Sequence, residues 1–191
     1  MKRVTINQAA KILKSGRIAV YPTETAYALG ADARSRAAVL EIYRLKGRDR
    51  KKPLALIAAS LNMVRRNFAL QGAAERLALR FWPGPLTLIL PIRERKIIKA
   101  LKIKEAGVRV SPHRVARALS RAIGGPIVAT SANQSGRANS YSAKSAARAF
   151  KNQIPVVDAG RIPRRPSSTV VAFRRDQPIV LRPGPVKITD S

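Results

Sequence analysis

Residues 18 to 30 read IAVYPTETAYALG, and this stretch does most to decide the fold. Its apolar start, Ile18 to Tyr21, predicts a short buried strand, which Pro22 ends because proline has no N–H to give to a sheet. Thr23 and Thr25 then fall in the loop that leaves the strand. Ligands of open α/β sheets bind where the chain leaves the carboxyl ends of strands, so these two hydroxyls are candidate ligand contacts.

About one helix further on, Lys46 and Arg48 place two cations on the next loop. Hydroxyls that orient a small polar substrate, together with cations for a phosphate, are the parts of a site that uses a nucleotide. An ordinary strand, turn and helix with a solvated basic end explains the same residues. The two interpretations stay open on this segment alone.

Helices and strands alternate along the first part of the chain and strands dominate later, which predicts an α/β fold with a mixed parallel and antiparallel sheet. We see no linker or internal repeat, so one domain over residues 1–191 is expected. Residues 93–104 are interpreted as a basic loop. The predicted helices are 5–14, 35–46, 60–68, 73–81, 112–123 and 142–150, and the predicted strands are 18–21, 54–58, 86–90, 107–110, 127–129, 156–157, 169–173 and 179–181.

Composition excludes several classes of site. The chain has no cysteine and one histidine, His113, so disulfides, thiolate metal sites and multi-histidine sites are ruled out. His113 stands at a predicted helix start, where a capping role is simpler than a place in a catalytic triad. The phosphate-binding patterns GxxxxGK[ST] and GxGxxG are absent. No apolar run approaches the roughly 20 residues of a membrane span, so a cytoplasmic location is expected.

Charge is the outlier of the composition. Thirty-eight Lys and Arg face ten Asp and Glu, which gives a formal net charge of +28, and the cations cluster at 44–52, 93–104 and 161–165. A domain with this field favours phosphate polymers and acidic ligands. A surface tuned for solubility, or a basic drift in composition, is the alternative.

A second candidate site is Ser131 to Gly136, SANQSG, which follows a predicted buried strand. Backbone N–H groups in such a loop can face an anion, although a plain turn fits too. Arg109 lies between two valines of a predicted strand, where burial is costly unless the cation meets an anion; an outward-facing position is the alternative. Arg182, at the end of the last strand, raises the same question.

Seven motifs in order make the chain similar to the YrdC/TsaC family of threonylcarbamoyl-AMP synthases. They cover about residues 4–185 and read YPTETAYALG, KGR followed by KPL, WPGPLT, VRV, TSANQSG, SSTVV and LRPG. The resemblance implies a YrdC-like fold, similar to the DHBP synthase-like fold, with a twisted mixed sheet flanked by helices and a basic concave face. The chain length resembles that of the single-domain bacterial TsaC branch. Longer relatives carry an extra C-terminal domain, for which a chain of this length is expected to have no room.

The resemblance also implies a reaction. L-threonine, bicarbonate or CO2, and ATP with its Mg²⁺ would form threonylcarbamoyl-AMP and pyrophosphate, the first step of t6A modification at position 37 of tRNA. Expected partners are these substrates, tRNA or double-stranded RNA on the basic face, and other t6A-pathway proteins in transient contact. No metal site on the protein and no membrane contact are expected. Such chemistry needs alignment and cations more than a strong base, which suits a chain poor in acids and histidine.

Carried over motif by motif, Thr25, Arg109, Ser168 and the Ala129 backbone resemble the threonine contacts. Lys46 and Arg48 resemble the catalytic phosphate cations, which also bind ATP. The other implied ATP contacts are Lys52, Ser131, Asn133, Asn139 and Arg182. Three positions depart from the usual family pattern: Ala28 replaces a Gly, Asp49 a Pro and Asn139 a common Ser.

Two other function classes remain. The chain could be an RNA-binding or ribosome-maturation module on the same scaffold, which the basic charge favours and the KGR and SANQSG motifs disfavour. A carbamoyl-transferring maturation factor is the remoter choice, because larger proteins embed a similar domain.

Overall fold

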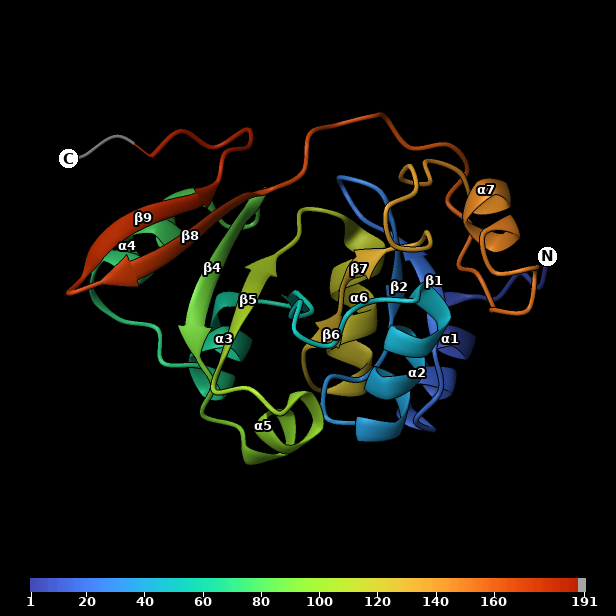
Figure 1. Ribbon diagram of the computed structural model, residues 1–191, viewed down its shortest axis with the longest axis horizontal. Coiled ribbons are helices and arrows are strands. Elements are labelled where there is room, and N and C mark those ends of the chain that lie inside the picture. The colour runs from blue at the N-terminus through green and yellow to red at the C-terminus, as the bar shows by residue number, and fades with distance from the viewer. Residues whose placement is uncertain (189–191) are drawn as a thin grey trace.

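The computed structural model describes residues 1–188 as two β-sheets with helices packed around them (Figure 1). The helices are α1 (Ile6–Lys14), α2 (Arg36–Lys46), α3 (Leu61–Asn67), α4 (Gly72–Phe81), α5 (Arg95–Leu101), α6 (Arg114–Ile123) and α7 (Ala143–Arg148). The strands are β1 (Ala19–Pro22), β2 (Tyr27–Gly30), β3 (Leu56–Ala58), β4 (Leu86–Pro91), β5 (Glu105–Val110), β6 (Ile127–Val128), β7 (Thr130–Ser131), β8 (Thr169–Arg174) and β9 (Gln177–Arg182). None of the helices in these residues is long and apolar enough to cross a bilayer.

The larger sheet has six strands in the order β6-β3-β5-β4-β8-β9. Strand β3 runs parallel to β5, and β4 runs parallel to β8, while the other neighbours are antiparallel. The central strands β3, β4 and β5 are almost entirely buried, as expected for apolar runs covered on both faces. The predicted α/β fold with a mixed sheet is confirmed.

The smaller sheet is antiparallel, in the order β1-β2-β7, and was not predicted. The segment quoted first folds as a hairpin: Pro22 is the last residue of β1, Thr23 to Ala26 form the connection, and Tyr27 pairs back with Pro22. Thr23 and Thr25 therefore lie in a loop as predicted. Residues 27–30, to which no element was assigned from the sequence, form a fully buried strand because their apolar side chains enter the core.

The two sheets meet at the strand predicted over 127–129. Val128 ends β6 in the larger sheet, and Thr130 begins β7 in the smaller one. Ala129 stands between them, and its N–H donates to the Ala55 carbonyl at 2.8 Å. One continuous segment thus crosses from sheet to sheet, and it places Ala129 at their junction.

Local capping rules account for most helix ends. Thr5 and Gln8 form the predicted capping box of α1, and Ser35 caps α2 with its hydroxyl. Gly47 ends α2 with φ +55°, a left-handed conformation that glycine adopts without strain. These predictions are confirmed.

Two sequence predictions are wrong. The basic segment 93–104 contains helix α5, which Glu94 caps by accepting from the Lys96 N–H at 2.9 Å. Ile97 and Leu101, four residues apart, are buried on its inner face, a helical spacing that the many charges obscured. The predicted strand at 156–157 is reduced to isolated bridges from Val156 to Arg3 and Val20.

A long segment connects α7 to β8 and runs across the top of the molecule, over both sheets (Figure 1). It is held near its middle because the Tyr27 hydroxyl donates to the Gly160 carbonyl at 2.8 Å and accepts from the Ala159 N–H at 3.0 Å. The segment ends at Ser168, which directly precedes β8. This path brings residues distant in sequence beside the junction of the sheets.

Candidate functional site

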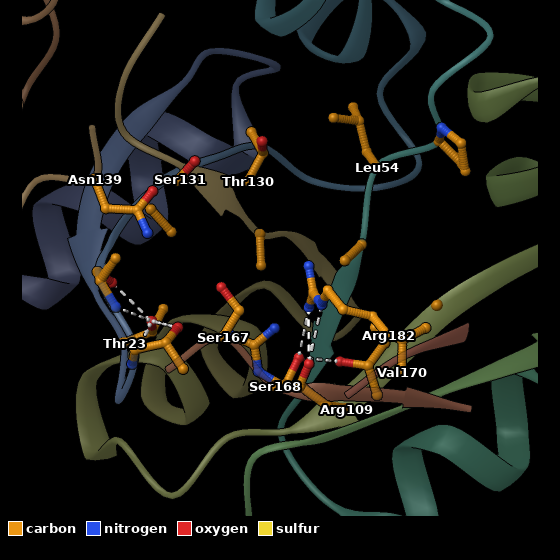
Figure 2. Close-up of a pocket in the computed structure, with 18 of the residues that line it drawn as sticks. Thr23, Leu54, Arg109, Thr130, Ser131, Asn139, Ser167, Ser168, Val170 and Arg182 are labelled. Atoms are coloured by element: carbon orange, nitrogen blue, oxygen red, sulfur yellow. Dashed lines mark hydrogen bonds between the residues drawn. The ribbon is translucent and has the colours of Figure 1, made fainter. Parts of the chain in front are cut away.

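A cavity of about 330 Å³ lies at the junction of the two sheets (Figure 2). This volume is in the range of pockets for small molecules. Its lining residues are Thr23, Thr25, Ala26, Tyr27, Ala28, Arg48, Pro53, Leu54, Ala55, Thr87, Ile89, Gly107, Arg109, Ala129, Thr130, Ser131, Asn139, Ser167, Ser168, Val170 and Arg182. Among these the charged residues are three arginines, and the other polar groups are hydroxyls and one amide.

The hairpin loop between β1 and β2 forms one wall. Thr23 is buried, and its hydroxyl donates to the Ala26 carbonyl at 2.7 Å and receives the Thr25 N–H at 3.3 Å. The Thr25 hydroxyl lies 3.2 Å from the Thr23 hydroxyl and is half-exposed at the cavity. The loop therefore uses Thr23 to fix its own turn, and Thr25 is left to meet a ligand.

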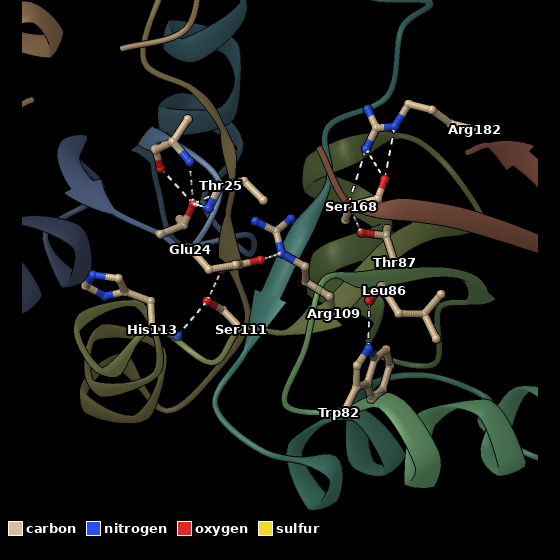
Figure 3. Close-up of polar contacts among 12 residues, drawn as sticks. Glu24, Thr25, Trp82, Leu86, Thr87, Arg109, Ser111, His113, Ser168 and Arg182 are labelled. Atoms are coloured by element: carbon tan, nitrogen blue, oxygen red, sulfur yellow. Dashed lines mark hydrogen bonds and ion pairs between the residues drawn. The ribbon is translucent and has the colours of Figure 1, made fainter. Parts of the chain in front are cut away.

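Arg109 comes from the buried strand β5 and meets an anion inside the protein. Its Nε donates to Glu24 Oε1 at 2.9 Å, and the two side chains are 8% and 5% exposed (Figure 3). The inward alternative of the sequence analysis is correct. Within residues 1–188, the two Nη groups have no hydrogen-bond partner, and the residue lines the cavity. They are available to a planar anion such as a carboxylate.

Ser168 and Arg182 form the opposite wall. Nη2 of Arg182 donates to the Ser168 carbonyl at 2.9 Å and to its hydroxyl at 3.2 Å (Figure 3). The Ser168 hydroxyl also lies 2.8 Å from the Thr87 hydroxyl. Burial lowers the pKa of Arg182, and the positive charge of Arg109 lowers it further, because the two guanidinium groups repel each other.

The backbone at Ser168 depends on a close approach by Gly184. A Cβ at position 184 would lie 2.4 Å from the Thr169 nitrogen and 2.6 Å from the Ser167 carbonyl oxygen. Only glycine fits there without a shift of the backbone. The LRPG motif thus holds the SST turn in place.

Arg48, Ser131 and Asn139 line the remaining side of the cavity. Arg48 is half-buried; its Nε donates to the Lys52 carbonyl at 3.1 Å and its Nη2 to the Pro53 carbonyl at 3.1 Å. These bonds fix the guanidinium at the cavity without a carboxylate partner among the described residues. An uncompensated cation there suits a phosphate.

Lys46, Asn133 and Lys52 are outside the cavity lining. Lys46 is the last residue of α2 instead of a loop residue and is 3% exposed. Its Nζ donates to the carbonyl oxygens of Ser131 and Asn133 at 2.5 Å each and to Asn133 Oδ1 at 3.2 Å. Burial, helped by the nearby Arg48 charge, lowers the pKa of Lys46 to about 8. The ammonium thus holds the SAN turn, while Lys52 is exposed.

His113 caps α6, as expected: its Nδ1 accepts from the Val115 N–H at 3.3 Å. Burial lowers the pKa of His113, which favours the neutral imidazole. It is outside the cavity lining.

Of the three departures from the family pattern, two are at the site. Ala28 lines the cavity from β2 and pairs with Ser131 of β7, and Asn139 lines it as well. Asp49 is exposed, and its Oδ1 accepts from the Lys51 N–H at 2.9 Å. It shapes the turn after Arg48.

Sequence reasoning missed Glu24, Ser111, Thr87 and Ser167. A signal for Glu24 existed: a buried Arg109 needs an anion, and Glu24 is one of ten acids and lies beside the candidate Thr25. Thr87 was assigned to a strand interior, and nothing in the sequence pairs it with Ser168. Eight of the eleven predicted site residues line one cavity: Thr25, Arg48, Arg109, Ala129, Ser131, Asn139, Ser168 and Arg182.

Comparison with known proteins matches residues 11–184 to the family model Sua5_yciO_yrdC, described as telomere recombination. The chain is 37% identical over 186 residues to the threonylcarbamoyl-AMP synthase of Bacillus subtilis, covering 94% of this chain and 53% of that protein. It is 39% identical over 162 residues to the protein of the same name from Thiobacillus denitrificans, covering 83% and 86%. The crystal structure of Pyrococcus abyssi Sua5 complexed with L-threonine superposes with a TM-score of 0.85 at 36% identity, covering 96% and 56%.

The chain spans about half the length of the first three curated relatives that it matches, at 53%, 54% and 53% of their sequences. Residues 11–184, which the family model matches, include every residue that lines the cavity. On the family model and on these identities, the chain belongs to the Sua5/YciO/YrdC family.

Proposed function

We propose that this protein is an L-threonylcarbamoyladenylate synthase, which makes threonylcarbamoyl-AMP and pyrophosphate from L-threonine, bicarbonate or CO2, and ATP. The observation that carries the proposal is the meeting of Thr25, Arg109 and Ser168 with Arg48, Ser131 and Asn139 around one cavity. One set suits an amino acid and the other a nucleotide. The names of the relatives, and the threonine complex of the Pyrococcus structure, support the same reaction.

In the proposed pose, the two free Nη groups of Arg109 bind the threonine carboxylate. The hydroxyls of Thr25 and Ser168 orient the rest of the amino acid, and the Ala129 backbone closes the space between the sheets. Because the three groups come from three separate segments, the pose is fixed from several sides. The threonine nitrogen is then directed toward the nucleotide side.

The bonds change in two steps. The threonine ammonium group first loses a proton to solvent. The free amine then adds to CO2 and gives its second proton to solvent, which forms a carbamate; bicarbonate supplies the CO2 by taking up a proton and losing water. A carbamate oxygen then attacks the α-phosphorus of ATP, the bond to the bridging oxygen breaks, and pyrophosphate leaves. Neither step needs a strong protein base, and most of the rate comes from alignment and from cations that offset phosphate charge.

Arg48 and Arg182 supply that positive charge at the cavity, with Ser131 and Asn139 toward the adenylate. Lys46 supports the Ser131–Asn133 turn through its hydrogen bonds, and its direct contact with a nucleotide phosphate stays a prediction. Mg²⁺ enters as the complex with ATP and is part of the substrate in this proposal. The lining of hydroxyls, one amide and guanidinium groups suits a metal held by phosphates.

The proposal includes a cytoplasmic setting, tRNA t6A modification as the use of the product, and transient contact with the proteins that consume it. The net charge of +28 supports an RNA-facing surface beside the cavity. Binding of tRNA or double-stranded RNA is proposed through phosphates, with little sequence preference.

Mass spectrometry of the product tests the proposed reaction. With ¹³C-bicarbonate, ATP and threonine, the adenylate product should carry one heavy carbon, and it should be missing when threonine is left out. An adenylate without the label, or ATP hydrolysis to AMP alone, would reject the proposal. A matched reaction with Arg109→Ala should lose the labelled product while the protein remains folded by circular dichroism.

A further inference from the structure

Glu24 lies directly behind Arg109 and is outside the cavity wall. Its Oε1 accepts from Arg109 Nε, and its Oε2 accepts a short hydrogen bond from the Ser111 hydroxyl (Figure 3). The Ser111 hydroxyl in turn accepts from the His113 N–H at 3.1 Å. Both carboxylate oxygens are therefore used inside the protein, and the Glu24 side chain reaches the cavity wall through its bond to Arg109.

The other two arginines of the cavity have different partners. Arg48 and Arg182 donate to carbonyl oxygens and, for Arg182, to the Ser168 hydroxyl. Neither forms an ion pair with a carboxylate among residues 1–188. Of the three guanidinium groups in the cavity wall, Arg109 alone has its charge balanced by a buried anion of the described chain.

This difference matters because the two expected ligand groups differ in charge. A free amino acid is a zwitterion with no net charge, whereas phosphate and pyrophosphate are multiply charged anions. A neutral Glu24–Arg109 pair offers the two Nη groups of the arginine at fixed directions and little net attraction for an anion. An unpaired guanidinium in a chain of charge +28 attracts any phosphate.

We infer that Glu24 is a positioning residue that sets selectivity: it aims Arg109 into the cavity and cancels its charge, so that this subsite takes the carboxylate of a zwitterionic amino acid and rejects inorganic phosphate. Arg48 and Arg182 remain for the nucleotide phosphates. The inference rests on the proposed function, in which Arg109 holds the amino acid.

The test compares wild-type protein with Glu24→Gln, using inorganic phosphate as the probe. Glutamine has the same shape and can keep hydrogen bonds to Arg109 and Ser111, so the change removes charge more than structure. In the variant, phosphate should inhibit competitively against threonine, with an inhibition constant about tenfold or more below that of the wild-type protein. The KM for ATP should stay within about twofold, because the charges of Arg48 and Arg182 are untouched.

Asp32→Asn is the matched control. Asp32 also pairs with an arginine, Arg34, at 2.7 Å in a partly buried site, but neither lines the cavity. This variant should leave phosphate inhibition and both KM values unchanged. A general loss of rigidity would change phosphate inhibition in both Asp32→Asn and Glu24→Gln, and that result would overturn the inference.

Unchanged phosphate inhibition in a folded Glu24→Gln variant would also overturn it. If that variant does not fold, Glu24→Asp takes its place, since the shorter side chain draws the charge away from Arg109; phosphate inhibition against threonine should then strengthen about threefold, and no change refutes the inference. Calorimetric titration of phosphate needs no turnover. A wild-type protein that lacks threonine-dependent turnover would reject the proposed function, whereas equal phosphate affinity in wild type and Glu24→Gln would reject the selectivity role.

Discussion

Lys46 Nζ donates to the backbone oxygen of Asn133 at 2.5 Å and to its side-chain oxygen at 3.2 Å, across 87 positions of sequence. The amide of Asn133 in turn donates to the Arg137 carbonyl, and the Lys46 carbonyl accepts from the Ser135 N–H at 2.9 Å. The end of α2 and the loop after β7 are thus held as one unit.

Lys46→Met should lower the free energy of unfolding by about 2 kcal/mol, because two or more buried oxygens lose their donor. It should also raise the KM for ATP more than the KM for threonine, since the loop carries Ser131. Urea denaturation and initial rates measure the two effects. A variant with wild-type stability and wild-type KM for ATP would show that the bond is dispensable.

Arg48→Ala should reduce kcat/KM for ATP about a hundredfold, the usual effect of losing one preorganised charge contact to a reacting phosphate. Lys52→Ala is the matched control, four residues away on the same turn, exposed and outside the cavity lining. It should change the rate less than about threefold. Equal effects of the two changes would assign the loss to the overall basic field instead of to one contact.

Thr25→Val should raise the KM for threonine about tenfold or more and leave the KM for ATP nearly unchanged. The change keeps the shape of the side chain and removes the hydroxyl that faces the cavity, which leaves a substrate polar group unpaired. Steady-state kinetics with each substrate varied in turn separates the effects. The assignment fails if ATP is the substrate whose KM rises.

Activity should fall above pH 8, where Lys46 loses its proton, because its pKa is lowered to about 8 and a neutral amine has too few N–H groups for its three oxygen partners. Stability should move the other way. The unfolded chain keeps this proton up to the ordinary pKa of lysine, so between pH 8 and that value the unfolded state binds more protons and the free energy of unfolding rises with pH. Rates and denaturation curves from pH 7 to 10 check the two trends. Activity that rises steadily to pH 10 would contradict this role of Lys46.

Binding of tRNA should weaken steeply with salt. If about six phosphates are neutralised by the basic surface, affinity should drop about a thousandfold between roughly 50 and 200 mM salt, with little dependence on RNA sequence. Titrations at several salt concentrations give the slope. If affinity did not change with salt, or no binding occurred at low salt, the +28 charge would serve solubility or a protein partner instead of RNA binding.

The sequence predicted local features well because their causes are local. The Thr5 cap and the Gly47 stop depend on neighbouring residues only, and the strand predicted at 18–21 is marked by its own apolar run. Helix α5 was missed because its burial depends on Ile97 and Leu101 meeting a core built from other segments. The small sheet was missed because β2 pairs with β7, a strand of two residues about a hundred positions away.

Contacts between residues distant in sequence also limit what the sequence predicts about the site. The motifs identified Thr25, Arg109 and Ser168 as candidate site residues, and in the structure all three line one cavity. The partners that tune them, Glu24 for Arg109 and Thr87 for Ser168, come from contacts 85 and 81 positions apart. Lys46 bonds to carbonyl oxygens of its own chain, which its place in a phosphate-type motif did not reveal, and its contact with a phosphate stays a prediction.

The most direct test of the proposed reaction is pyrophosphate release measured with each substrate left out in turn. We predict release that requires ATP, L-threonine and bicarbonate together, falls to background when any one is missing, and is lost in folded Arg109→Ala protein. Release that continues without threonine or without bicarbonate would contradict the proposed synthase reaction at this cavity.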